Sequence, residues 1–321
     1  AAHARRQRQR VYVASLVGSA VEFYDFLIYS TAASLVFGTV FFAGVSPAIG
    51  VIASFATLAV GYVVRPLGGI VFGHFGDRVS RKSALIWTLM LMGVSTALIG
   101  LLPTSAQVGA LAPVLLIVLR LVQGLAVGGE WGGAVLMSVE HAKANTRGLL
   151  GSATQTGSAV GLLLSFVAFA ALGGLSQEQF LSWGWRLPFL ATLVLMAIGL
   201  YVRLRIEESP VLVAEQSKER PAHAPARPPL FALLRERPGR VLLAIGVDAG
   251  PFMAQAVVTS FLVSYATTTF GLPRQVLLNS LMIASAGMLV TIPLFALLSD
   301  KVGRRPVYIT AAILTGVHAF V

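Results

Sequence analysis

Apolar stretches of about 20 residues recur along the whole chain, and this is the length that an α-helix needs to cross a hydrocarbon layer ~30 Å thick. Hydrophobic residues make up 56% of the chain and charged residues 12%, which is too apolar for a water-soluble core. The stretches lack the period-two alternation of barrel strands, so helices are expected. The sequence therefore predicts an all-α polytopic membrane protein with eight spans and part of a ninth. The expected spans are Leu16–Phe42, Gly50–Phe75, Ala84–Leu102, Pro113–Val139, Leu149–Leu175, Leu187–Arg203, Val241–Phe270, Val276–Leu298 and Val307–Val321.

Basic residues concentrate in every second turn between the spans, whereas the turns near residues 47 and 103 carry no charge. The net charge of +11 is therefore a topology signal rather than a nucleic-acid-binding surface. By the positive-inside rule the amino terminus is cytoplasmic, and we expect a multi-pass protein of the plasma membrane. The basic segments are Arg5–Arg10, Arg78–Lys82, Lys143–Arg147 and Arg203–Arg240.

Two charged strings of similar composition, Asp77–Lys82 and Asp300–Arg305, lie between spans in the two parts of the chain. Segment 204–240 is rich in proline and charge, so it is expected to be a cytoplasmic linker rather than a span. The chain then divides into an amino-terminal six-helix lobe (1–203), this linker, and the start of a carboxyl-terminal lobe (241–321). If the second lobe repeats the first, the chain is a fragment with about eight and a half of twelve spans. Duplicated bundles are typical of secondary transporters.

Two acidic residues, Glu22 and Asp25, interrupt the first span. An ionised carboxylate at the centre of a membrane helix costs about 2.5–3.5 kcal/mol on insertion scales. Counted from Val11, the two residues lie about 16 and 21 Å deep on one helix face. Carboxylates at such depth suit the binding and release of a proton. The alternative is a structural pair with an arginine.

A polar stripe runs along the fourth span. Arg120, Gln123 and Glu130 share one helix face, which should turn toward the bundle interior. The Arg120 guanidinium suits a substrate carboxylate held by two parallel hydrogen bonds. A pair with Asp25 or Glu130 would satisfy its donors equally well.

Arg65 in the second span is a second candidate cation. It lies about 18 Å along the helix from Asp77, too deep for its side chain to reach water easily. Arg65 either attracts an anionic substrate or pairs with Glu22 or Asp25. The remaining candidate substrate contacts are Tyr24, Gln123, Glu130 and Gln155, of which Gln155 equally suits hydrogen bonding between helices.

The charged strings place an acid before several bases at a helix end. Charges there can hold one helix against its neighbours and bias a transporter between outward-open and inward-open states. A topology signal alone would explain the bases but not the matching positions of Asp77 and Asp300, so we expect a gating latch. Its charged members are Asp77, Arg78, Arg81 and Lys82 in the first copy and Asp300, Arg304 and Arg305 in the second.

The sequence indicates neither a metal, a cofactor nor an enzymatic centre. The chain contains no cysteine, and its five histidines never fall at metal-ligand spacing. No combination of nucleophile, base and metal ligands is found at the spacing that an enzyme would need. Transport is therefore favoured over catalysis, with no cofactor.

The first charged string resembles the G-x-x-x-D-R-x-G-R-K turn between helices two and three of the major facilitator superfamily, with Ser80 in place of a glycine. The second string matches less fully, with Ala296 at the leading glycine position. Arg120–Gly124 resembles the family's R-x-x-Q-G motif on helix four. The resemblance adds two glycines to the expected latch. The matching residues are Gly73, Asp77, Arg78, Arg81 and Lys82 in the first copy and Asp300, Gly303, Arg304 and Arg305 in the second.

Within the superfamily the chain is most similar to the metabolite:proton symporters, which carry organic acids and zwitterionic osmolytes. The motifs that carry this similarity are Val21–Phe26, Gly128–Gly133, Gly184–Phe189 and Glu208–Pro210, the last two of which sugar porters share. The resemblance covers essentially the whole chain. It implies a two-lobed carrier of twelve helices, with helices one, four, seven and ten lining the path.

These features predict a proton-coupled symporter that imports a small polar metabolite, an organic acid or a zwitterionic osmolyte, by alternating access. Glu22 and Asp25 would carry the proton, and Arg65 and Arg120 would attract the negative group of the substrate. The partners would be the lipid bilayer of a bacterial inner membrane, the substrate and protons, and a monomer would suffice. The alternatives are a uniporter or exporter of a sugar or another solute on the same scaffold, a membrane enzyme, or a non-transporting sensor.

Overall fold

The computed structural model describes residues 2–216, 235–257, 265–266, 269–272 and 274–318, and within these ranges the regular structure is helical, with no strand. Seven helices in the described residues are long and apolar enough to cross a membrane. The prediction of an all-α polytopic fold is confirmed. The seven helical segments are Arg6–Val40, Pro47–Arg78, Arg81–Leu101, Leu111–His141, Arg147–Ala170, Arg186–Leu204 and Asn279–Val302.

These segments agree with the first six expected spans and with the eighth. The seventh expected span begins in helix α13 (Pro238–Ala256), but most of its second half lies outside the described residues. The ninth coincides with α16 (Arg304–His318), whose 15 residues fall short of a full crossing. Residues 217–234 of the expected linker also lie outside the described residues.

Contacts divide the chain into two compact units, one of residues 1–217 with 288–321 and one of residues 218–287. The first unit contains the six-helix bundle and the carboxyl-terminal part of α15 (Arg274–Val302) with α16. The second unit contains α13 and the first part of α15. The lobe boundaries expected near residues 203 and 241 stay a prediction.

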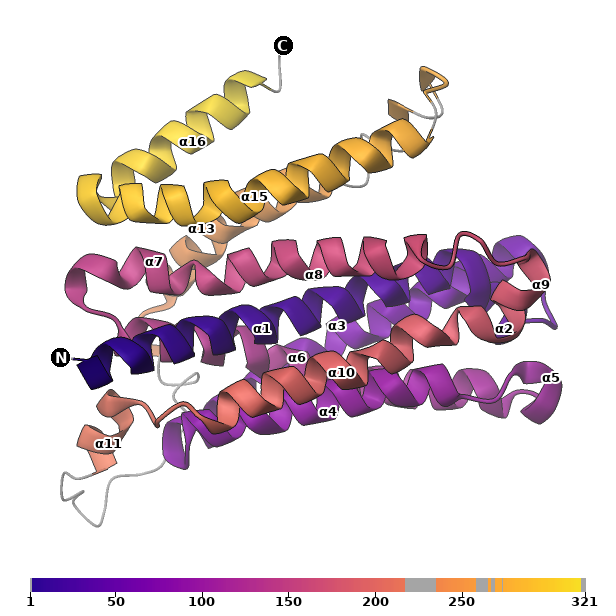
Figure 1. The fold of residues 1–321 in the computed structure, drawn as a ribbon, viewed down its shortest axis with the longest axis horizontal. Helices are drawn as coiled ribbons and strands as arrows, with labels where there is room; N and C mark the ends of the chain where they lie inside the picture. The colour runs from indigo at the N-terminus through magenta and orange to yellow at the C-terminus, as the bar shows by residue number, and fades with distance from the viewer. Residues whose placement is uncertain (1, 217–234, 258–264, 267–268, 273, 319–321) are drawn as a thin grey trace. The chain divides into compact units, whose positions relative to one another are not determined.

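The bundle of the first unit is built from helices that run nearly alongside one another (Figure 1). Helix α1 continues through a π-helical turn, η1, into α2, so that one segment forms the first crossing. Short helices α5, α9 and α11 and the turns η2 and η3 join or follow the long ones. The bounds are α1 Ala2–Ala32, η1 Ala33–Phe37, α2 Gly38–Val40, α3 Pro47–Arg78, α4 Arg81–Leu101, α5 Ser105–Val108, α6 Leu111–His141, η2 Ala144–Thr146, α7 Arg147–Gly151, α8 Ala153–Ala170, α9 Gln177–Gln179, η3 Phe180–Gly184, α10 Arg186–Leu204 and α11 Pro210–Gln216.

Glycines let two helix pairs approach closely, α3 with α6 and α1 with α8. A Cβ atom added to Gly68 would overlap the backbone of Leu125, and one added to Gly128 would overlap the Arg65 carbonyl. In the second pair, Gly157 and Gly161 of α8 face the α1 backbone in the same way. In a membrane, where lipid tails are as apolar as the side chains, such close contact is a principal source of helix association.

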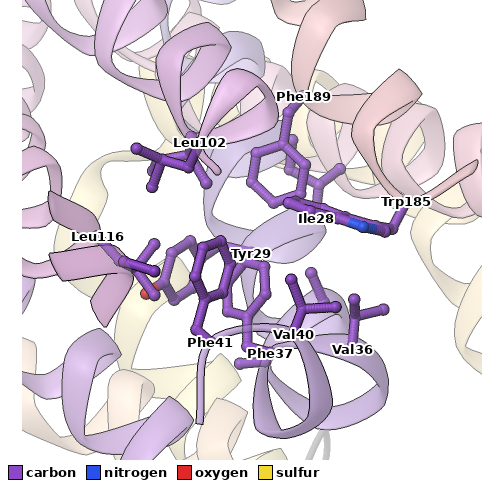
Figure 2. Close-up of a cluster of buried hydrophobic side chains, with 14 of the residues drawn as sticks. Ile28, Tyr29, Val36, Phe37, Val40, Phe41, Leu102, Leu116, Trp185 and Phe189 are labelled. Atoms are coloured by element: carbon purple, nitrogen blue, oxygen red, sulfur yellow. The ribbon is translucent and has the colours of Figure 1, made fainter. Parts of the chain in front are cut away.

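An aromatic cluster fills the end of the bundle opposite the amino terminus. Phe37 makes edge-to-face contacts with Tyr29, Phe41 and Trp185, with ring centroids 4.9–5.8 Å apart. Figure 2 shows these rings together with Phe189 and the surrounding aliphatic side chains. The cluster joins α1 and η1 to α10, and it holds the carboxyl-terminal part of the first span against α10.

Ser80 explains how the first charged turn forms without its usual glycine. Its backbone is extended, with φ of −168°, so a side chain is tolerated there. The Ser80 hydroxyl accepts a hydrogen bond of 2.9 Å from the Ser83 N–H and so caps the first turn of α4.

We expect the replacement Gly128→Val to lower the thermal stability of the purified protein by about 5 °C or more, because the new side chain must push α6 away from α3. Gly132→Val on the same helix is the matched control, since a Cβ there meets nothing within 4 Å. Unfolding in detergent can be followed by tryptophan fluorescence. Equal melting temperatures for the two variants would contradict the packing described here.

Candidate functional site

Asp25 lies at the centre of a hydrogen-bond relay that joins three helices to α1. Its carboxylate is buried, 1% exposed, and accepts hydrogen bonds from Thr96 of α4 at 2.7 Å and from Thr192 of α10 at 3.1 Å. Gln123 of α6 donates to the Thr96 hydroxyl at 2.7 Å. Neutral hydroxyl groups therefore solvate Asp25 in place of water.

Arg120 reaches Asp25 only through this relay. Its Nη1 donates to the Gln123 side-chain oxygen at 2.5 Å. The guanidinium carbon lies 3.0 Å from the centroid of the Tyr29 ring, a cation–π contact. The Tyr29 hydroxyl in turn contacts the Thr57 hydroxyl of α3. Neither of the two expected ion pairs of Arg120, with Asp25 or with Glu130, is formed directly.

Glu22 faces Arg65 across the gap between α1 and α3. The Glu22 Oε1 atom lies 4.0 Å from Arg65 Nη1, at the outer limit of an ion pair. Glu22 is buried, and its Oε2 atom has no hydrogen-bond partner among the described residues. The Arg65 side chain is 32% exposed and lies over the Tyr62 ring, 4.2 Å from its centroid. One of the expected pairs of Arg65 is therefore present, but it is loose.

A small cavity between α1, α3 and α6 connects the two arginines. It encloses about 20 Å³, room for about one water molecule. Three predicted site residues, Arg65, Arg120 and Gln123, line it, whereas no acidic side chain does. The full lining is Phe26, Leu58, Gly61, Tyr62, Arg65, Arg120, Gln123, Gly124 and Val127.

Three of the expected substrate contacts lie elsewhere. The Tyr24 hydroxyl donates to the Pro188 carbonyl at 2.8 Å, and its ring belongs to the aromatic cluster. Gln155 is exposed on α8. Glu130 is fully buried and pairs with Arg203 of α10. None of the three lines the cavity.

The Glu130–Arg203 pair is the most fully hydrogen-bonded of the buried charges in the described residues, although Arg203 Nε has no partner there. Arg203 Nη2 contacts Glu130 Oε1, and Nη1 donates to Oε2 at 3.1 Å. Thr88 of α4 donates to the same Oε2 at 2.6 Å, and the Leu85 carbonyl accepts from Arg203. A Cβ atom on Gly18 would overlap the guanidinium, so glycine at this position of α1 makes room for the pair.

The residues of the first charged string form a network at one end of the bundle. Arg81 pairs with Glu140 of α6 and lies 3.4 Å from Asp77, and Ser209 donates to Glu140 at 2.5 Å. Lys82 Nζ donates to the Leu204 carbonyl at 2.9 Å. Its backbone N–H lies 3.3 Å from both carboxylate oxygens of Glu208. The string therefore ties α3 and α4 to α6, α10 and the segment before α11. Gly73 lines a groove between α3, α4 and α6, and a Cβ atom added to it would meet nothing within 4 Å.

The acid of the second string contacts a helix end. Asp300 accepts hydrogen bonds from the backbone N–H groups of Gly148 at 2.8 Å and Leu149 at 3.0 Å. Gly303, with φ of 103°, makes the left-handed turn that follows. Arg304 and Arg305 lie exposed in the first turn of α16. Asp300 thus contacts the start of the fifth crossing, a contact that the composition of the string did not specify.

Several site residues were not predicted from the sequence. Thr96 and Thr192 give no signal because hydroxyl residues are frequent in membrane helices, where they bond their own backbone. Arg203 was placed at the end of the sixth span without a partner, although a cation next to an apolar stretch is a recognisable signal. Glu140 directly follows the fourth expected span, and its position at a span end gives no signal of a partner. Among the described residues no group of three or more metal-ligating side chains comes together.

Comparison with known proteins agrees with this arrangement of helices and charges. The family model described as "Sugar (and other) transporter" matches residues 11–227. The chain belongs to this family of membrane transporters. The assignment confirms the resemblance to the major facilitator superfamily and places the protein among transporters rather than enzymes, with the lipid bilayer and a small solute as its partners.

Two curated relatives and one solved structure show the range of this family. The shikimate transporter of Escherichia coli is 45% identical over 313 residues, covering 97% of this chain and 71% of the relative. The proline/betaine transporter of Salmonella typhimurium is 34% identical over 312 residues, 95% of this chain and 62% of the relative. The proton:xylose symporter XylE, an E. coli protein of the major facilitator superfamily, matches with a TM-score of 0.72 at 20% identity. That match covers 94% of this chain and 71% of XylE, and it shows a shared fold.

We expect Glu130→Gln to destabilise the purified protein strongly, because it leaves Arg203 buried without a counter-charge. Breaking a buried pair on one side costs about 3–5 kcal/mol, whereas replacing both partners by apolar residues is often neutral. The double variant Glu130→Met with Arg203→Met should therefore recover most of the lost melting temperature. A single variant as stable as the parent, or a double variant less stable than the single one, would contradict a structural pair.

Proposed function

We propose that the protein is a proton-coupled symporter that imports a small metabolite carrying a carboxylate, an organic acid or a zwitterion. One observation carries the proposal. Two arginines line a cavity among the membrane-spanning helices, and two buried carboxylates lie beside them on α1. Ionisable groups inside a membrane protein are costly, and they commonly mark the path of a substrate or a proton.

The substrate class follows from the charge of the cavity. Arg65 and Arg120 present two cations to a space that no acidic side chain lines. Shikimate, proline and betaine, which the names of the relatives mention, differ in shape but share one carboxylate. A guanidinium binds a carboxylate through parallel hydrogen bonds, so the two arginines that line the cavity suit the group that these compounds have in common.

Proton coupling is assigned to Glu22 and Asp25. Both are buried carboxylates whose charge is only partly neutralised. Asp25 accepts hydrogen bonds from hydroxyl groups but has no direct contact with a cation, and Glu22 has Arg65 at 4.0 Å. By contrast, Glu130 has a close arginine and a hydroxyl donor, and we assign it a structural role. Tyr24 and Gln155 are assigned no direct contact with the substrate.

Alternating access would use the charged turns as a latch. Arg81, Lys82 and Asp77 tie helix ends of the six-helix bundle together. Asp300 bonds the start of α7 from a part of the chain that follows the expected linker. Two charge-assisted hydrogen bonds to backbone N–H groups can favour one state without being permanent. We place this end, with the amino terminus, in the cytoplasm of a bacterial cell, following the distribution of basic residues.

A sugar transporter is the second candidate, because the solved structures that match the fold include the proton:xylose symporter. A neutral sugar would leave Arg65 and Arg120 without an anionic ligand. Uptake measurements therefore separate the candidates directly.

For the full-length protein in proteoliposomes, we expect accumulation of at least one labelled carboxylate from a panel of shikimate, proline, betaine and xylose. Accumulation should require an inward proton gradient and should be abolished by a protonophore. Xylose uptake unaffected by a protonophore would instead support a sugar uniporter. Uptake of none of these compounds would refute the proposed substrate class.

In the variant Asp25→Asn, substrate accumulation driven by the proton gradient should fall about tenfold or more. A side chain that transfers a proton in an enzyme typically contributes at least that factor to the rate. Exchange of labelled for unlabelled substrate across the membrane, which needs no net proton movement, should be reduced less. Glu178→Gln, an exposed acid in α9, is the matched control. Parental accumulation by Asp25→Asn would remove this residue from the coupling mechanism.

The variant Asp300→Asn should weaken the latch. Because the chain has no cysteine, a single Thr146→Cys substitution reports the accessibility of the turn before α7. In the Asp300→Asn background, the loss of about 1 kcal/mol of hydrogen bonding should raise the rate at which the cysteine at position 146 is alkylated about fivefold. The same rate in the Asp300→Asn and parental backgrounds would show that Asp300 does not hold this end closed.

A further inference from the structure

We propose that the cavity selects an organic anion without an ammonium group, so that a zwitterion such as betaine is excluded. The inference rests on the proposed function, because it requires a substrate carboxylate at the cavity beside Arg65 and Arg120. It narrows the proposed substrate class to organic acids. It also assigns the selection to the two guanidinium groups and to the aromatic rings that they cover.

The cavity wall has no acidic group that would hold a positive charge. A buried ammonium needs either a carboxylate or the face of an aromatic ring, because water no longer solvates it. No acidic residue lines the cavity. Asp25 is buried, and its carboxylate accepts hydrogen bonds from Thr96 and Thr192. Glu22 is also buried, and it faces Arg65 at 4.0 Å. The ammonium of a ligand would therefore find no counter-charge in the wall.

The tyrosines beside the cavity already hold cations. The guanidinium of Arg65 lies over the Tyr62 ring, with its carbon 4.2 Å from the ring centroid. Tyr29, which does not line the cavity, is covered by the Arg120 guanidinium in the same way, at 3.0 Å. Phe26 is the other aromatic residue of the lining, and it makes an edge-to-face contact with Tyr62. Proteins recognise a quaternary ammonium with a cage of aromatic rings, and this lining has one ring without a cation.

The guanidinium groups that attract a carboxylate also repel a second positive charge. Nε and Nη2 of Arg120 are buried and have no hydrogen-bond partner among the described residues. A planar carboxylate can accept from two such donors. In betaine one methylene group separates the carboxylate from the quaternary nitrogen, so a carboxylate bound there brings the positive charge close to a guanidinium. Like charges so close repel strongly where water is excluded.

Two pairs of compounds of nearly equal shape test the selection. The first pair is betaine and its carbon analogue dimethylbutanoate, in which a neutral quaternary carbon replaces the positively charged nitrogen. The second pair is shikimate and aminoshikimate, in which an ammonium group replaces one ring hydroxyl. Each compound competes with the uptake of labelled shikimate by the full-length protein in proteoliposomes. We expect the anion of each pair to inhibit uptake at a concentration about tenfold or more below that of its zwitterionic twin.

The variant Arg65→Gln tests whether this arginine sets the selection. It removes one positive charge and uncovers the Tyr62 ring, so the ratio between the twins should narrow about fivefold or more. Arg65→Lys keeps the charge and should keep most of the parental ratio. Arg6→Gln, which removes an exposed cation of α1, is the matched control and should leave the ratio unchanged. A general loss of affinity moves both members of a pair and cancels in the ratio.

The outcomes distinguish this inference from the proposed function. Equal inhibition within either pair in the parent protein overturns the inference alone, because both members carry the carboxylate that the proposed function requires. Accumulation of betaine or proline without shikimate in the uptake panel overturns it in the same way. If the protein takes up none of these carboxylates, the proposed function fails together with the inference. A parental ratio in Arg65→Gln overturns the role assigned to Arg65, and the ratio in the parent protein decides the substrate class even where this variant fails to fold.

Discussion

An ionised group enclosed by membrane-spanning helices must find compensation where it stands, because water is absent and the energetic penalty of a lone charge is large. This constraint orders the interior of the bundle. Glu130 and Arg203 satisfy it by direct pairing, with two contacts to each other and further bonds to Thr88 and the Leu85 carbonyl, and only Nε of Arg203 lacks a partner among the described atoms of the pair. Asp25, Glu22, Arg65 and Arg120 satisfy it only in part. The difference separates a structural pair from a group of charges that is free to accept a ligand and a proton.

Close helix packing makes this arrangement possible. Glycines bring α6 against α3 and α8 against α1, and the polar side chains of α1, α3, α4, α6 and α10 reach one another across short distances. Gly18 has a more specific role, since any side chain there would displace Arg203 from Glu130. The aromatic cluster closes the opposite end of the bundle and holds α1 against α10 (Figure 2). The polar centre thus lies between a rigid aromatic end and a charged end whose contacts are hydrogen bonds and ion pairs.

The sequence was sufficient to predict seven helical crossings, the family and three of the residues that line the cavity. Length and hydropathy identify a membrane helix because the bilayer imposes both. Arg65, Arg120 and Gln123 stood out because polar residues are rare in such stretches. The partners could not be predicted in the same way. Whether Arg120 meets Asp25 directly or through Gln123 and Thr96 depends on the rotation and depth of three helices, which side-chain spacing on one helix does not determine. Likewise, nothing in the spacing of Glu130 distinguished a substrate contact from a pair with Arg203.

The most direct test is a structure of the full-length protein with a bound carboxylate substrate. The account predicts carboxylate oxygens about 3 Å from Arg120 Nε or Nη2 and from the guanidinium of Arg65. A substrate bound away from both arginines would contradict the central claim.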